Sequence, residues 1–221
     1  MSRPTPAPSV QLQNREAAGQ QLAQMLSSYS RQPQTLVVAL PRGGVPVAAQ
    51  IADALQLPLD VCLVRKLGVP GQPELAMGAI AAHGVRVLND DIISRMGISE
   101  AVIEQVALIE AEELERRDRT YRHGRLPLNV AGQTVILVDD GIATGSTLRA
   151  AIAILRQQQP QRLVVAVPIA PPTTVEQLAK EVDEVVCLIQ PEPLYSISLW
   201  YRNFDQTSDE TVCQLLNQSR H

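Results

Sequence analysis

The sequence predicts an α/β fold in which a mostly parallel, five-stranded sheet is flanked by helices. Short, continuous apolar runs, typical of strands buried on both faces, recur along the chain. Segments with helical spacing of apolar residues separate most of these runs, and this alternation is typical of a parallel sheet covered by helices. With 221 residues, 45% apolar and 19% charged, the chain is long and apolar enough to bury such a core.

Local patterns place the individual elements. The expected strands span residues 36–40, 59–64, 134–138, 163–169 and 184–189. The expected helices span residues 14–29, 45–55, 90–96, 99–121, 146–158 and 174–180, and a last helix opens at the capping box Thr207-x-x-Glu210. Three glycines and two prolines predict a long loop over residues 65–78, followed by a hairpin of residues 79–82 and 85–88.

The composition argues against membrane and nucleic-acid roles. No apolar run approaches the ~18 residues of a membrane-spanning helix. A formal net charge of −4 and an aromatic content of 3% disfavour a nucleic-acid surface. Acids interleave with the bases around residues 116–125, which favours a solvated helix end there. Three scattered cysteines and an N-terminus without an apolar signal core predict a cytoplasmic protein.

The segment VILVDDGIATGST at residues 135–147 carries the strongest functional signal. A buried strand delivers Asp139 and Asp140 to its carboxyl end, where parallel sheets bind ligands. A loop with glycines and three hydroxyls follows, and the amides of the next helix start can bind a phosphate. Adjacent carboxylates can hold vicinal hydroxyls or a magnesium ion, so the pattern fits a sugar phosphate. The alternative is a strand–turn–helix in which the aspartates only cap the helix. The Walker and dinucleotide-binding glycine motifs are both absent.

Residues 135–147 resemble the phosphoribosyl pyrophosphate (PRPP) motif of the type I phosphoribosyltransferases, in which four apolar residues and two acids precede a Gly/Thr/Ser loop. Further segments resemble a group of predicted phosphoribosyltransferases within that superfamily: PRGGVPVA at 41–48, VRKLG at 64–68, PELAMGAI at 73–80 and LWYRNFDQTSDE at 199–210. The likeness covers nearly everything from residue 14 onward.

The resemblance also implies a domain organisation. We expect one phosphoribosyltransferase-like domain over residues 14–206, which includes a helical insertion at 97–125 and a small hood at 190–206. A disordered tail at 1–13 is expected to precede it, and a C-terminal helix at 207–221 is expected to pack on it.

The resemblance implies a role for each part of the PRPP site. Asp139 and Asp140 would bind the ribose hydroxyls and contribute, directly or through water, to holding Mg²⁺. The 5′-phosphate would be bound by the loop residues Gly141, Ile142, Ala143, Thr144, Gly145, Ser146 and Thr147. The pyrophosphate loop would consist of Arg42, Gly43 and Gly44, and in this superfamily that loop often holds a non-proline cis peptide.

The expected 65–78 loop resembles the start of the mobile loop that closes over the leaving pyrophosphate in the adenine and orotate enzymes. Arg65 and Lys66 would be its basic, catalytic residues. Glu74 would be an acid/base or a partner for Lys66, with a plain surface carboxylate as the alternative. Such a lid would exclude water from a reaction that passes through a sugar cation.

The acceptor pocket is expected in the hood, to which the N-terminal helix could also contribute. Tyr195, Trp200 and Tyr201 could stack on a flat base, or they could pack the hood's own small core. Enzymes for 6-oxopurines carry an acid at the third residue after the acidic pair, and this chain has Ala143 there. The resemblance therefore argues against hypoxanthine or guanine chemistry by that route.

The implied function is magnesium-dependent transfer of the phosphoribosyl group from PRPP to a nitrogenous base or similar acceptor, with release of pyrophosphate, in nucleotide metabolism. The expected partners are PRPP, the acceptor and a second copy of the chain in a homodimer. The alternative is a catalytically silent regulator that senses PRPP and binds nucleic acid or a protein partner. A scaffold protein on the same fold is a third reading, which the intact site loops disfavour.

Overall fold

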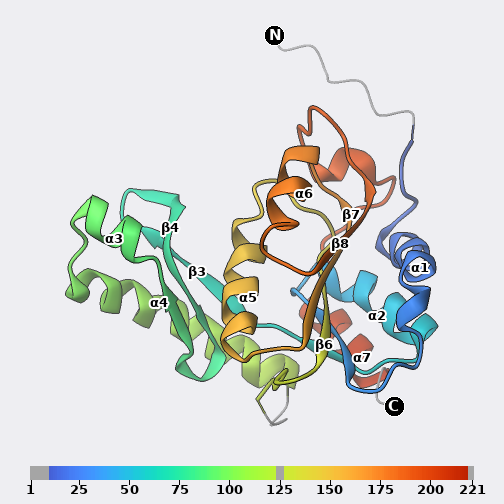
Figure 1. The fold of residues 1–221 in the computed structure, drawn as a ribbon, viewed down its shortest axis with the longest axis horizontal. Helices are drawn as coiled ribbons and strands as arrows, with labels where there is room; N and C mark the ends of the chain where they lie inside the picture. Colours follow the sequence, from blue (N-terminus) through green and yellow to red (C-terminus); the bar gives the residue numbers. More distant parts are fainter. Residues whose placement is uncertain (1–9, 123–126, 219–221) are drawn as a thin grey trace.

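A five-stranded sheet forms the centre of the computed structural model, which describes residues 10–122 and 127–218 (Figure 1). Its strands lie in the order β2-β1-β6-β7-β8, and every neighbouring pair is parallel. They are β1 Thr35–Ala39, β2 Leu59–Val61, β6 Thr134–Val138, β7 Arg162–Ile169 and β8 Glu184–Ile189. The predicted α/β fold with a five-stranded parallel sheet is confirmed.

Helices cover both faces of this sheet (Figure 1). On one face lie α1 Arg15–Met25, α2 Gly44–Leu55 and α7 Asp209–Gln218; on the other lie α5 Ser146–Gln157 and α6 Pro172–Leu178. Alternate residues of each strand serve the two faces: Val37 packs in the core shared with α1 and α2, and Val38 packs in the core shared with α5. Because both faces are covered, the central strands are buried along their length, which explains their continuous apolar runs.

A second, three-stranded sheet replaces the long loop expected over residues 65–78. It is antiparallel, in the order β3-β4-β5, with β3 Val64–Val69, β4 Gln72–Ala81 and β5 Arg86–Leu88. The expected loop was wrong because its glycines and prolines masked a period-two pattern in which Leu67, Val69 and Met77 are buried. The glycine at position 71 serves the tight turn between β3 and β4, where its φ is 79°.

Two further helices, α3 Asp90–Met96 and α4 Glu100–Arg122, follow this sheet. The α4 helix packs on β3 and β4, and its last turns reach α7 (Figure 1). Its buried face carries Leu114 and Tyr121. Within the insertion expected at 97–125, residues 100–122 are therefore helical, and residues 123–126 lie outside the described part of the chain.

The two ends of the chain differ from expectation in detail. Residues 1–9 and 219–221 lie outside the described residues. The tail expected over 1–13 does not extend to residues 10–13, because Leu12 is buried and forms a bridge with Tyr201. The last helix is capped by Ser208 and not by Thr207, since the Thr211 amide donates to the Ser208 hydroxyl over 3.2 Å. None of the helices in the described ranges has the length and apolarity that a membrane crossing requires.

Candidate active site

Two adjacent aspartates lie at the carboxyl end of the central strand β6. Asp139 accepts a hydrogen bond through Oδ1 from the Asp140 amide at 2.9 Å. Burial, and secondarily the negative charge of Asp140, raises the pKa of Asp139 well above its usual range. The two carboxyl groups therefore differ: the raised pKa of Asp139 disfavours its ionisation, whereas Asp140 forms an ion pair with Arg15.

The loop after the aspartates, residues 141–147, leads directly into α5. Its glycines permit a tight path: a Cβ on Gly141 would lie 2.6 Å from a methyl carbon of Ile197, and Gly145 has a φ of 74°. The hydroxyls of Thr144 and Ser146 are 3.1 Å apart. The first-turn amides of α5 have no partner within the helix and lie at its positive end. Together they form a cradle suited to a phosphate.

Side chains from the neighbouring elements hold this cradle in place. Arg149 donates from Nη1 to the Thr144 carbonyl at 2.9 Å, and its Nε pairs with Glu181 at 2.8 Å. Thr174, on α6, donates to the Ala143 carbonyl at 3.3 Å. The carbonyl oxygens of Thr144 and Ala143 are thus held by side chains from α5 and α6, and the Ile142 amide donates to the Ile169 carbonyl at 2.7 Å, so the path of the loop is fixed.

The loop between β1 and α2, residues 41–44, lies against the aspartates. The peptide bond between Pro41 and Arg42 is cis, as the family resemblance implies. A Cβ on Gly43 would be 2.0 Å from Oδ2 of Asp140, and one on Gly44 would be 2.7 Å from the Val138 carbonyl oxygen. Both glycines are thus required by contact distance, and they bring the backbone of loop 41–44 against the two aspartates.

A clamp formed by Arg15, Phe204 and Tyr201 surrounds Asp140. Arg15 contacts Oδ2 of Asp140 through Nε at 2.8 Å and through Nη2 at 2.7 Å, and its Nη1 donates to the Asp205 carbonyl at 2.6 Å. Its guanidinium carbon lies 3.9 Å from the centre of the Phe204 ring. That ring stacks on Tyr201 at 4.8 Å, and the Tyr201 hydroxyl donates to the Asp140 carbonyl at 2.7 Å. The clamp ties α1 and the hood to one aspartate.

An open cavity of about 690 Å³ brings these parts together. Four predicted PRPP-site residues, Arg42, Gly43, Asp140 and Ala143, line it, together with hood residues 195–198. Arg15 and Phe204 line it as well. Strands β1 and β6 are neighbours in the sheet, so loops 41–44 and 139–147 meet at one edge, as their positions after parallel strands predict.

Of the three aromatic residues proposed to stack on the acceptor, only Tyr195 lines this cavity, where it is 70% exposed. Tyr201 is 4% exposed and packs with Leu12, Ala18 and Ile169 in a core that joins the hood to α1 and β7, so its predicted role in acceptor binding is wrong. Burial raises the pKa of its phenol far above the usual range. Trp200 is half-buried against the same core and does not line the cavity. Tyr201 and Trp200 therefore follow the alternative prediction, in which these aromatic residues pack in an apolar core.

The three residues expected on a mobile loop lie on strands. Arg65 and Lys66 belong to β3, and Glu74 belongs to β4, although the placement of the Glu74 side chain lies outside what the structure describes. Arg65 pairs with Glu110 of α4 at 2.5 Å, so part of its charge is committed to holding the helix on the sheet. Neither Arg65 nor Lys66 lines the 690 Å³ cavity.

The carboxylates fit a magnesium ion that is carried mainly by substrate oxygens. Within residues 10–122 and 127–218, no group of three or more His, Cys, Asp or Glu is placed to hold a metal. Asp140 is already paired with Arg15, and the raised pKa of Asp139 favours its neutral form. The site thus offers at most two carboxyl groups, which suits Mg²⁺ bound to substrate phosphates and not to a closed protein cage.

Sequence reasoning missed Arg15 and Phe204. Arg15 is the first residue of α1, directly after the N-cap Asn14, where the helix dipole disfavours a cation. A cation at this unfavourable position was the signal in the sequence, since it indicates a partner elsewhere in the fold. Asp140, through its ion pair with Arg15, is that partner. Phe204 gives no local signal, since the segment around it has no period to interpret.

The Asp139→Asn variant is expected to raise the free energy of unfolding at pH 8 relative to the wild type. The folded chain holds the Asp139 proton to a higher pH than the unfolded chain, where the pKa is about 3.9. Wild-type stability therefore falls as the pH rises above about 4 and through the raised pKa, and a neutral asparagine escapes this loss. Urea unfolding at pH 5 and pH 8 would show the gap widening with pH. No widening, or the same widening in the exposed control Asp53→Asn, would contradict the account.

Comparison with known proteins places the chain in a family. The phosphoribosyl transferase domain matches residues 10–196. A Mycobacterium tuberculosis protein named "Putative phosphoribosyl transferase" is 47% identical over 206 residues, which cover 93% of this chain and 46% of that protein. The "Bifunctional protein PyrR" of Microcystis aeruginosa is 42% identical over 86 residues, covering 34% of this chain and 49% of that protein. The chain thus spans about half the length of the curated relatives it matches.

A solved structure supports the same placement. The crystal structure of TT1426 from Thermus thermophilus superposes with a TM-score of 0.87 at 37% identity, covering 96% of this chain and 100% of that one. The chain belongs to the phosphoribosyl transferase domain family.

Proposed function

We propose that the protein transfers the 5-phosphoribosyl group of PRPP to a nitrogenous acceptor and releases pyrophosphate. The observation that carries this proposal is the junction of β6 and α5, where two carboxyl groups stand beside an amide-lined cradle. A pentose phosphate matches both parts at once, its hydroxyls facing the acids and its phosphate facing the amides. Family membership supports the same substrate class.

The described residues divide the work of binding and orientation. Asp139 and Asp140 would bind the ribose hydroxyls, and residues 141–147 would bind the 5′-phosphate. Arg42 would contact the pyrophosphate, whose bond to ribose C1 breaks as the acceptor nitrogen forms its own bond to C1 from the opposite face. The protein would act mainly by positioning the two groups and by stabilising the negative charge that the leaving group gains. Mg²⁺, bound by the substrate oxygens, would supply additional charge neutralisation.

The residues that line the cavity also limit the chemical class of the acceptor. Of the described residues that line it, Asp140 is the only carboxylate, and Arg15 occupies one of its oxygens. Ala143 stands at the position where an acid would face a 6-oxopurine. We therefore favour an acceptor whose nitrogen attacks with a free lone pair and passes its proton to solvent or to the departing pyrophosphate.

Pyrophosphate release tests this function. The protein would be incubated with PRPP, Mg²⁺ and one acceptor at a time from a panel of purines, pyrimidines and small amines. We expect release with at least one acceptor and none without an acceptor. Binding of PRPP without release across the panel would favour the regulator, and absence of PRPP binding would refute the proposed substrate.

The Arg15→Gln variant is expected to raise the KM for PRPP about tenfold, since Asp140 would lose two charge-assisted hydrogen bonds that orient it. Arg15→Lys should restore part of the affinity, because it returns the charge without the paired geometry. Initial rates over a range of PRPP concentrations measure both. Glu16→Gln, at the next, exposed position of α1, serves as the control. Equal KM values in all four proteins would show that the clamp has no positioning role.

A further inference from the structure

Arg117, on the helix α4, lies beside both loops of the proposed PRPP site. A small cavity of about 20 Å³ is bordered by Arg117 and Leu114 of α4, by Pro41 of the loop after β1 and by Thr147 at the end of the phosphate cradle. The helix that carries Arg117 packs against β3 and reaches α7. Residues far apart in the sequence thus bring a third element to the edge of the site.

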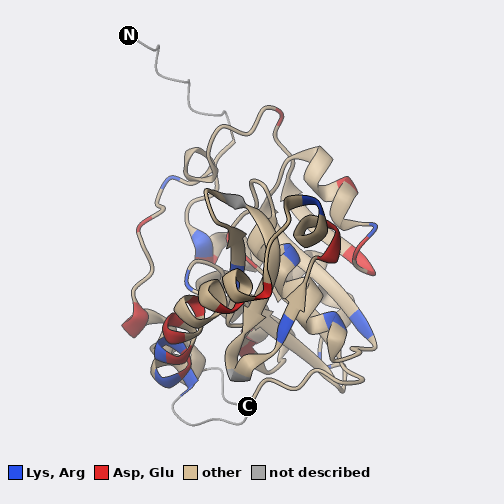
Figure 2. Ribbon diagram, turned by 90° about the vertical axis from the view of Figure 1, so that its left-hand side faces the viewer, with Lys and Arg blue, Asp and Glu red and all other residues tan. Residues whose placement is uncertain are grey.

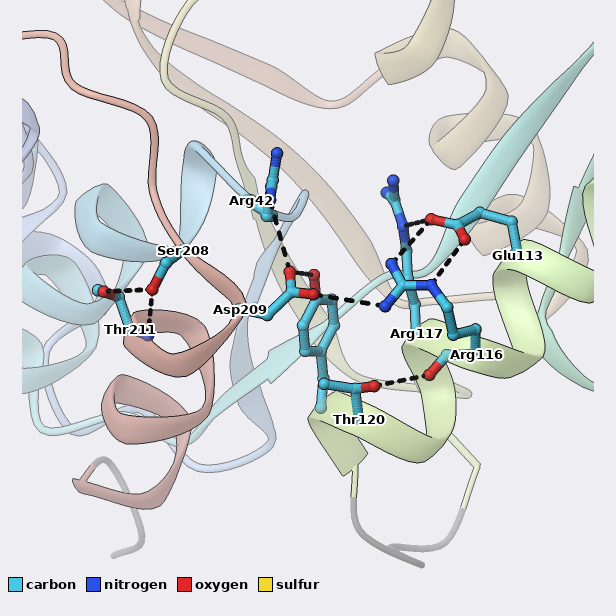
Figure 3. A network of polar contacts seen from close by, with 9 residues as sticks. Arg42, Glu113, Arg116, Arg117, Thr120, Ser208, Asp209 and Thr211 are labelled. Atoms are coloured by element: carbon cyan, nitrogen blue, oxygen red, sulfur yellow. Dashed lines mark hydrogen bonds and ion pairs between the residues drawn. The ribbon is translucent and has the colours of Figure 1, made fainter.

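The guanidinium of Arg117 is only partly used within the protein. Its Nε donates to Oε1 of Glu113 at 2.6 Å, and the side chain is 25% exposed. The two terminal nitrogens have no hydrogen-bond partner within the part of the chain that the structure describes. Figure 3 shows them extending past Glu113, in the same direction as the guanidinium of Arg42 and away from α7. Four N–H donors therefore remain available on Arg117.

Two carboxylates hold this group of arginines in position. Glu113 pairs with Arg116 at 2.8 Å as well as with Arg117, and its hydrogen bonds to Arg116 and Arg117 lower its pKa to about 2. Asp209 of α7 accepts from the Tyr121 hydroxyl at 2.5 Å and lies 3.7 Å from Arg42 (Figure 3). Hydrogen bonding from Tyr121, and secondarily from Arg116, lowers the pKa of Asp209. Both carboxylates thus stay ionised at neutral pH.

The balance of charge favours an anion at this place. Three arginines (Arg42, Arg116 and Arg117) face two carboxylates (Glu113 and Asp209), and Arg116 is engaged by both acids. The charged residues of α4 are acidic up to Glu115, and its bases lie in the last two turns, from Arg116 onward (Figure 2). The two guanidinium groups that project from the cluster are those of Arg42 and Arg117. A planar guanidinium with free donors is the side chain best suited to bind phosphate oxygens.

We propose that Arg117 of α4 adds a second guanidinium, beside that of Arg42, to the place where the pyrophosphate group of PRPP and the released pyrophosphate bind. This inference rests on the proposed function, which places the pyrophosphate at loop 41–44. The leaving group gains negative charge as the C1–O bond breaks, so two fixed cations beside it stabilise the transition state as well as the bound product. The α4 helix thereby contributes a binding residue to the site in addition to its packing role.

Binding of two separate fragments tests this role of Arg117. Inorganic pyrophosphate and ribose 5-phosphate, each with Mg²⁺, would be titrated calorimetrically into the full chain and into Arg117→Gln. We expect Arg117→Gln to weaken pyrophosphate binding about 10- to 100-fold, the range for loss of a charged hydrogen bond, and to leave ribose 5-phosphate binding unchanged. Arg119→Gln is the matched control, because Arg119 lies on the same helix, is 74% exposed and pairs with Glu115. It should change neither affinity.

The outcomes separate the two proposals. Wild-type affinity for pyrophosphate in Arg117→Gln would overturn the role of Arg117 while leaving the proposed function intact, provided that the wild type binds PRPP. An equal loss for both fragments would show that Arg117 acts through the fold, and it too would overturn that role. A wild-type chain that binds neither fragment nor PRPP would refute the proposed function, and the role of Arg117 with it.

Discussion

Replacement of both acids, Asp139→Asn with Asp140→Asn, is expected to reduce PRPP affinity by roughly one and a half to three orders of magnitude. In the wild type one ribose hydroxyl would bond to the ionised Asp140, a contribution of about 1.5–3 kcal/mol, and another to Asp139, whose raised pKa favours the neutral form, a contribution of about 0.5–1.5 kcal/mol. Losing both bonds amounts to ~2–4.5 kcal/mol, or roughly 30- to 2,000-fold in the dissociation constant. Asparagine keeps the shape of each side chain, so the central strand β6 should remain packed. Calorimetric titration with PRPP and Mg²⁺ measures the affinity.

The chain supplies a matched control for this experiment. Asp90 and Asp91 form a second Asp-Asp pair, which lies exposed in the first turn of α3. The Asp90→Asn, Asp91→Asn double variant makes the same two substitutions and should bind PRPP as the wild type does. Equal affinity in the wild type and in the Asp139/Asp140 variant would refute the assignment of the ribose site. Circular dichroism and thermal unfolding establish that each variant is folded.

Much of the site was predictable because it depends on local sequence and on a general rule of parallel sheets. The acidic pair and the loop 141–147 are contiguous, so their chemistry is visible without knowledge of the fold. The rule that ligands bind beyond the carboxyl ends of parallel strands then brought loop 41–44 to the same place, and the pairing of β1 with β6 confirms it. The sequence thus predicts those parts of the site that depend on one short segment and on one rule of sheet topology.

The remainder depends on contacts between distant segments, which no local pattern specifies. Arg15 reaches Asp140 across 125 positions, and Tyr121 reaches Asp209 across 88. The β3–β4 hairpin was missed because its alternation is interrupted by a register shift between Leu67 and Val69, a region rich in glycine. Tyr201 is predictable as an aromatic residue of the hood, but its burial follows only from its stacking on Phe204 and its bridge to Leu12.

A single methyl group, added by Gly43→Ala, is expected to weaken PRPP binding about 100-fold. The new Cβ would lie 2.0 Å from Oδ2 of Asp140, the atom that pairs with Arg15 at 2.7 Å, so the carboxylate must leave this partner. Backbone strain is not the cause, because Gly43 has a φ of −61°, which alanine adopts readily. The loss should therefore come from displacement of one side chain, measured as PRPP affinity in a variant that circular dichroism shows to be folded.

A double-mutant cycle with Asp140→Asn tests this cause directly. If the Gly43→Ala methyl acts by displacing the Asp140 carboxylate, removing that carboxylate leaves the methyl little more to disturb. The double variant should then bind PRPP no more weakly than the weaker single variant, and the two effects should be strongly non-additive, as is typical of residues in contact. Additive losses would show instead that alanine distorts loop 41–44 itself, which would move the importance of Gly43 from the ribose site to the pyrophosphate site.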